Sequence, residues 1–110
     1  MTMDPGPDLM VLLAELAAEL DEVTSSGGEG IVAYQVAGVV FARVSADALE
    51  VRLPADIADA ALRTPDTNAL AGAPGWLRFA PQGRERHVTD RASAWFRTAW
   101  RHAASRSRGD

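Results

Sequence analysis

The 110-residue chain contains no cysteine and no lysine, and these two absences exclude several kinds of chemistry. Without cysteine there is no disulfide, no thiolate nucleophile and no cysteine-ligated metal, which suits a reducing compartment. Without lysine, the run from Thr24 to Gly28 lacks the residue that a phosphate-binding P-loop requires. We therefore expect a cytoplasmic protein and interpret this Gly/Ser-rich run as a flexible loop.

Features that direct a chain to a membrane or to a metal are equally scarce. Glu15 and Glu19 interrupt the first apolar run, and no basic residue precedes it, so we expect no signal peptide and no membrane association. Two histidines, His87 and His102, are spaced unlike the ligands of known metal sites. We expect His102 to be partly protonated beside a helix C-terminus. The sequence predicts no metal, no cofactor and no catalytic residue.

Charge is the most uneven property of the chain. Residues 1–66 hold 12 acidic and 3 basic side chains, whereas residues 67–110 hold 3 acidic and 8 basic ones. Such a division favours an acidic face, a basic face and an electrostatic partner. It is equally compatible with an acidic first helix that lies beside a basic last helix, either of the same chain or of a second copy. A homodimer is therefore one expected form.

Apolar residues at helical spacing predict two helices in the first two thirds of the chain. The first carries its stripe from Leu9 to Val23, with Asp8 as N-cap and the Gly/Ser run as its end. The second is short, begins after Pro54 and ends near Arg63.

A third helix is predicted near the end of the chain, with Thr89 or Asp90 as its cap. Its apolar stripe carries Trp95, Phe96 and Trp100. Large aromatic side chains are stabilised by burial, so we expect all three in the core.

Four segments have the composition of strands. Ile31–Val36, Val39–Val44 and Ala48–Leu53 are rich in β-branched and aromatic residues and are separated by short turns, which predicts an antiparallel meander. The first two are apolar on both faces, so we expect them to be central or covered. Trp76–Ala80 is predicted to be a fourth strand, reached through a long surface loop at residues 64–75.

Together these elements predict one α+β domain over residues 1–110. Its four-stranded antiparallel sheet consists of the three-stranded meander and one later strand, covered by the N-terminal and C-terminal helices in the order αβββαβα. We expect residues 1–7 and 105–110 to be disordered, because they have little to bury.

A contact surface is the function that these residues favour most. Trp76 and Arg78 share one face of their strand, and tryptophan with arginine is the composition enriched at binding hot spots. His87, Arg97 and Arg101 complete the candidate surface. We interpret the chain as a non-catalytic binding or interaction module for an unidentified protein or small-molecule partner.

Two alternatives stay open. The arginines of the last helix, Arg97 and Arg101 among them, would suit the phosphates of a nucleic acid. A small enzyme or accessory subunit acting on an unknown metabolite would have to use His87, Arg78 and Asp90.

Three short motifs also carry a family resemblance. The segments 38–43, 49–54 and 75–79, followed by an aromatic-rich helix, resemble the small "luciferase domain" family and, more distantly, the MmcQ/YjbR-like proteins. The resemblance covers roughly residues 30–104 and implies the same order of strands and helices. Where that family places histidines, this chain has Arg43-Val44-Ser45 and residues 69–74, so the resemblance implies no histidine-dependent activity here. Some YjbR-like proteins are labelled DNA-binding.

Overall fold

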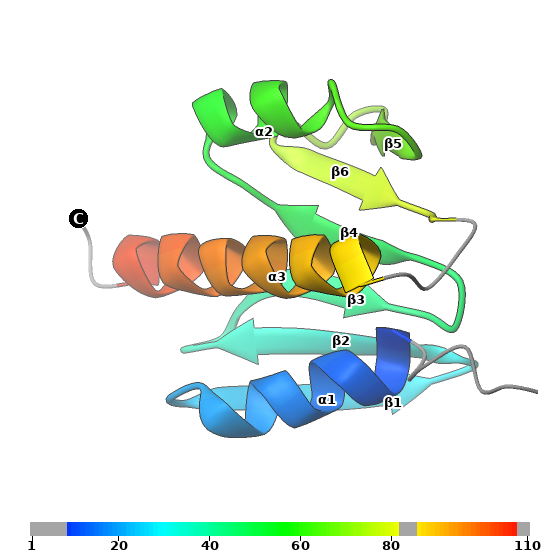
Figure 1. Cartoon of the computed structure of the whole chain (residues 1–110). Coiled ribbons are helices and arrows are strands. Elements are labelled where there is room, and N and C mark those ends of the chain that lie inside the picture. The colour runs from blue at the N-terminus through cyan, green and yellow to red at the C-terminus, as the bar shows by residue number, and fades with distance from the viewer. Residues whose placement is uncertain (1–8, 82–85, 108–110) are drawn as a thin grey trace, which may run out of the picture.

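The computed structural model describes residues 9–81 and 86–107, which form a six-stranded antiparallel sheet and three helices. The predicted α+β class is confirmed, but the sheet has six strands instead of four, and the order is αββββαββα (Figure 1). The elements are α1 Leu9–Glu19, β1 Val23–Gly28, β2 Ile31–Val36, β3 Val39–Val44, β4 Leu49–Arg52, α2 Ala55–Ala61, β5 Thr67–Ala69, β6 Trp76–Phe79 and α3 Arg86–Ser107.

The first additional strand is the Gly/Ser-rich run that composition assigned to a loop. β1 pairs with β2 in antiparallel register along its whole length, from Val23 opposite Val36 to Gly28 opposite Ile31. Glu29 and Gly30 join the two strands with φ of 51° and 82°, the positive values that a type I′ hairpin turn requires. The loop prediction was wrong because register and turn geometry outweigh the weak strand propensity of glycine and serine.

The second additional strand lies inside the predicted long loop. β5 has three residues and pairs with β6 at the edge of the sheet. Thr67 fixes the approach to it, because its hydroxyl donates to the carbonyl oxygens of Thr64 at 2.7 Å and Ala61 at 3.1 Å. A strand of three residues is too short to show a two-residue periodicity. The turn residues around it were therefore the only signal in the sequence, and they predicted a loop.

The strand order β1-β2-β3-β4-β6-β5 places β2 and β3 inside the sheet, as predicted. α1 and α3 lie side by side across one face, and α3 also contacts β2, β3 and β4 (Figure 1). α2 lies near β5 and β6 at one edge (Figure 1). The core therefore forms between one sheet face and the pair α1 and α3.

A bulge in β3 increases the aromatic content of this core. Tyr34 pairs with Ala42 and Gln35 pairs with Val40, so Phe41 is an extra residue in its strand. Phe41 and Ala42 are consequently both fully buried although they are neighbours in sequence. The Phe41 ring meets Phe96 of α3 edge to face at a centroid distance of 5.2 Å.

The aromatic stripe of α3 divides between the core and its border. Phe96 is fully buried, as predicted, whereas Trp95 and Trp100 are only partly buried. Trp95 packs edge to face on Phe79 at 5.1 Å, and the Trp100 indole Nε1 donates to the Asp21 carbonyl oxygen at 3.1 Å. The prediction that all three lie in the core is thus confirmed for Phe96, while the two indoles pack against the core from its border.

Several predicted helix boundaries need correction. α1 ends at Glu19, and Val23 belongs to β1. α3 begins at Arg86, before the predicted caps, and it includes residues 105–107, which were expected to be disordered. Pro54 is the N-cap of α2, which ends at Ala61. The predictions for residues 1–7, for Asp8 and for residues 108–110 lie outside the described residues.

Candidate contact surface on the open face of the sheet

Among the described helices, α1 and α3 pack on one face of the sheet and α2 lies at its edge, so the second face has no covering helix. β4 and β6 alternate strictly between the two faces. Leu77 and Phe79 of β6 are buried on the helix side of the sheet, where Phe79 packs on Trp95 of α3, so Trp76 and Arg78 point to the opposite side. β4 places Arg52 beside Trp76 and Glu50 beside Arg78 in the same register. We call this side the open face; its residues are Ile31, Ala33, Gln35, Val40, Arg43, Glu50, Arg52, Asn68, Trp76 and Arg78.

Glu50 lies at the centre of a charged row across three strands. One carboxylate oxygen is 3.3 Å from the Arg78 Nη1, and the other is 3.7 Å from the Arg43 Nε. Both arginine side chains are 45% exposed, so the pairs add little to stability. The two ion pairs instead determine where the arginine side chains lie, since one carboxylate holds both guanidinium groups on the surface.

Trp76 is held in the same arrangement. The Arg43 guanidinium carbon is 4.6 Å from the centroid of the indole ring, within cation–π distance. Because β4 lies between β3 and β6, the two side chains must reach toward each other across that strand. Trp76 is only partly buried there, so part of a large aromatic surface stays accessible.

The open face combines positive charge with exposed apolar side chains. Arg43, Arg52 and Arg78 against Glu50 leave a net charge of +2 among its strand residues. Ile31 is 49% exposed and Val40 is 36% exposed. The prediction that β2 and β3 are central is therefore right, while no described helix covers their second face.

This surface is shallow. A hollow of about 30 Å³ lies between Arg43, Glu50, Arg78 and the turn after β3. That volume is about what one water molecule occupies in liquid water. Binding sites for small molecules usually measure about 300–1,000 Å³. The open face is thus better matched to a protruding partner side chain than to an enclosed substrate.

The structure separates the predicted contact residues into two groups. Trp76 and Arg78 lie together on the open face. His87, Arg97 and Arg101 belong to α3, which packs on the other side of the sheet, and all three are exposed. The five residues therefore do not form one surface.

The same separation applies to the three residues that a small enzyme would need. Arg78 is on the open face, whereas His87 and Asp90 are exposed in the first turns of α3. The structure does not bring them together. Within residues 9–81 and 86–107, no cluster of three or more histidine, aspartate or glutamate side chains could hold a metal ion, and no helix is long and apolar enough to cross a bilayer.

The two oppositely charged parts of the chain approach each other at the end of α1. Asp21 and Glu22 line one side of a hollow of about 200 Å³, and Trp100 and Arg101 of α3 line another. The expected neighbourhood of an acidic first helix and a basic last helix is therefore present within one chain. Among the residues that the structure describes, however, both ion pairs are those of Glu50.

The fold alters the titration of His102. Its partial burial lowers its pKa, and the positive charges of Arg106 and Arg52 lower it further. These effects favour the neutral imidazole, contrary to the expected partly protonated side chain.

Tyr34, whose ring is buried under α1, provides a pH prediction. Burial raises its pKa above the ordinary 10.0, so the folded protein keeps the phenol proton longer than the unfolded chain. Stability from this source is complete below pH 10 and is lost as the pH rises above that value. Urea denaturation at pH 9 and pH 11 should show a smaller alkaline loss for Tyr34→Phe than for the wild type. Equal losses would contradict the assignment.

Three charged residues of the open face were missed as site residues: Arg43, Glu50 and Arg52. For Glu50 and Arg52 a signal exists in the sequence, since Leu49, Val51 and Leu53 alternate with them, which is the pattern of a strand with one solvent-exposed face. Arg43 gave none, because β3 reads as apolar on both faces and the bulge at Phe41 changes its alternation.

The comparisons with known proteins do not add to this geometry. No protein-family model matches the chain, and neither the curated proteins nor the solved structures contain a match. The resemblance to the luciferase-domain and MmcQ/YjbR-like proteins therefore stays a prediction, and the function is argued from the surface alone.

Proposed function

We propose that this protein is a non-catalytic interaction module that binds a protein partner through the open face of its sheet. The observation that carries the proposal is the fixed group of Trp76, Arg43 and Arg78 around Glu50 on a face without a covering helix. Trp and Arg are the residues enriched at binding hot spots, and a side chain that is already held in place loses less entropy on binding.

The chemistry of the open face indicates the kind of partner. Its net charge of +2 favours a partner surface rich in carboxylates, which would also accelerate the encounter at low ionic strength. Exposed Ile31 and Val40 favour apolar side chains within that surface. A second copy of this chain is one candidate, since its α1 region is acidic.

The test begins with a cross-link inside cells. A photoreactive amino acid at Val40, which is exposed on the open face, should give an adduct, whereas the same probe at Ala94, exposed on α3, should not. The captured partner is then purified and its Kd is measured. Trp76→Ala and Arg78→Ala should each weaken binding at least tenfold, about 1.4 kcal/mol, with little change in far-UV circular dichroism.

Arg97→Ala and Arg101→Ala are the matched controls, because they remove the same charge from α3. Retained affinity in these two variants supports the proposal. No adduct at Val40, or an adduct partner whose Kd is unchanged by Trp76→Ala and Arg78→Ala, would overturn it. Binding to an oligonucleotide that fails in the α3 variants and weakens with salt would instead assign the function to nucleic acid.

A further inference from the structure

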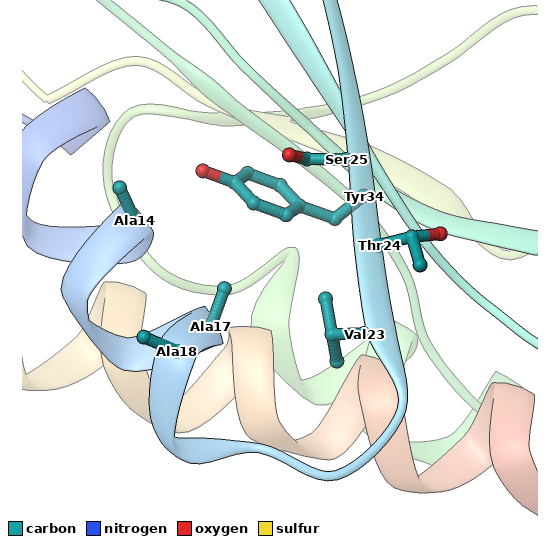
Figure 2. A pocket seen from close by; sticks show the side chains of 7 residues that line it. All are labelled: Ala14, Ala17, Ala18, Val23, Thr24, Ser25 and Tyr34. Atoms are coloured by element: carbon teal, nitrogen blue, oxygen red, sulfur yellow. The ribbon is translucent and has the colours of Figure 1, made fainter.

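A third hollow lies on the helix side of the sheet, between α1 and the first two strands. It measures about 240 Å³ and is lined by Ala14, Ala17, Ala18, Val23, Thr24, Ser25 and Tyr34 (Figure 2). Three alanines on α1 form one wall, and their small side chains leave the space between the helix and β1 unfilled. The open face, with Trp76, is on the other side of the sheet.

The tyrosine in this pocket has a buried ring and a hydroxyl group that reaches solvent. Tyr34 is 4% exposed, and its ring packs edge to face on Phe96 at 5.2 Å. Figure 2 shows its hydroxyl directed toward α1, on the same side as the Ser25 hydroxyl. Among the described residues its hydroxyl has no hydrogen-bond partner, and that atom is not sealed from solvent. The hydroxyl group can therefore hydrogen-bond to water or to a small molecule that enters the pocket.

The walls determine what such a ligand can be. No acidic or basic side chain lines the pocket, which disfavours an ion. Alanine and valine surfaces favour an apolar body, while Tyr34 and Ser25 offer hydroxyl groups at one side. A cavity of about 150 Å³ accommodates benzene, so this volume suits a molecule of one ring or a short branched chain with one polar group.

We propose that the pocket between α1 and β1 binds a small neutral molecule whose apolar body lies against Ala17 and Val23 and whose polar group hydrogen-bonds to the Tyr34 hydroxyl. This inference does not depend on the open face. A protein partner and a small molecule would then occupy opposite sides of the sheet.

Phenol and toluene are suitable probes, because they have nearly the same shape and only phenol has a hydroxyl group. The methyl resonances of Val23, which lines the pocket, report occupancy by NMR in every variant. Phenol should give shifts that saturate in the millimolar range, as expected for a ligand of this size. Tyr34→Phe should raise the Kd ratio of phenol to toluene about threefold to tenfold, the effect of one hydrogen bond.

Two further variants test the position. Ala14→Leu adds volume at an exposed residue of the pocket wall and should weaken both probes at least fivefold, whereas Ala94→Leu, on α3 and outside the lining, should change neither. The proposal is overturned if phenol shifts do not saturate, if Tyr34→Phe leaves the ratio unchanged, or if Ala14→Leu and Ala94→Leu act alike. Any of these outcomes leaves the proposed role of the open face unaffected.

Discussion

Replacing Phe96 with alanine should reduce the free energy of unfolding by about 3–5 kcal/mol, the usual cost of removing a buried aromatic ring. The ring is completely buried and contacts Tyr34 and Phe41 edge to face, each at 5.2 Å. It therefore joins α3 to β2 and β3. Because small domains are stable by about 5–15 kcal/mol, the variant should unfold at a much lower urea concentration, as followed by circular dichroism.

Val40→Ala is the control, since it removes an apolar side chain that is 36% exposed on the open face. This substitution should lower the free energy of unfolding by no more than about 0.5 kcal/mol. If Phe96→Ala costs less than about 1 kcal/mol, then α3 is not docked on the sheet as described here, and the two-layer arrangement fails with it.

The second large effect is expected at Gly75. The Ala73 carbonyl accepts from the Trp76 amide at 3.0 Å, with Pro74 and Gly75 as the central residues, and Gly75 has φ of 86° as a type II turn requires. A Cβ at this position would lie 3.3 Å from the Leu53 carbonyl oxygen, a backbone atom that cannot rotate away. Gly75→Ala should therefore lower the free energy of unfolding by about 2–3 kcal/mol, as measured by urea denaturation.

Gly72 provides the matched comparison. It occupies the same place in the preceding turn, where the Ala73 amide donates to the Leu70 carbonyl at 3.2 Å, and its φ is 74°. Nothing lies within 4 Å of a Cβ built there, so Gly72→Ala should show the backbone strain alone, about 1 kcal/mol. Equal losses in the two variants would mean that the contact with Leu53 has no effect. Only Gly75→Ala should disturb the fluorescence of the adjacent Trp76.

Much of this fold was predictable because its central strands have strong local patterns. β2, β3, β4 and β6 combine β-branched or aromatic residues with clear turn residues at their ends. β1 and β5 escaped prediction for a shared reason: each is an edge strand that exists through pairing with a neighbour, and neither composition nor periodicity reveals pairing. The same limit hid the bulge at Phe41.

The open face illustrates how far strand alternation can lead. It placed Trp76 and Arg78 on one side, but it could not show that Arg43, far away in sequence, lies over the indole. Nor could it show that α3 carries Arg97 and Arg101 to the other side of the sheet. Spatial separation between residues on different elements depends on topology, which a single sequence does not specify.

The position of α3 has a consequence for how this protein is made. β1, β2, β3 and β4 follow one another along the chain and pair in that order, so they can associate as soon as they leave the ribosome. Their apolar side nevertheless lacks its principal cover until α3, the last described element, has been synthesised. During that interval the nascent sheet exposes its apolar side to solvent. A premature stop before α3 would yield a product prone to aggregate.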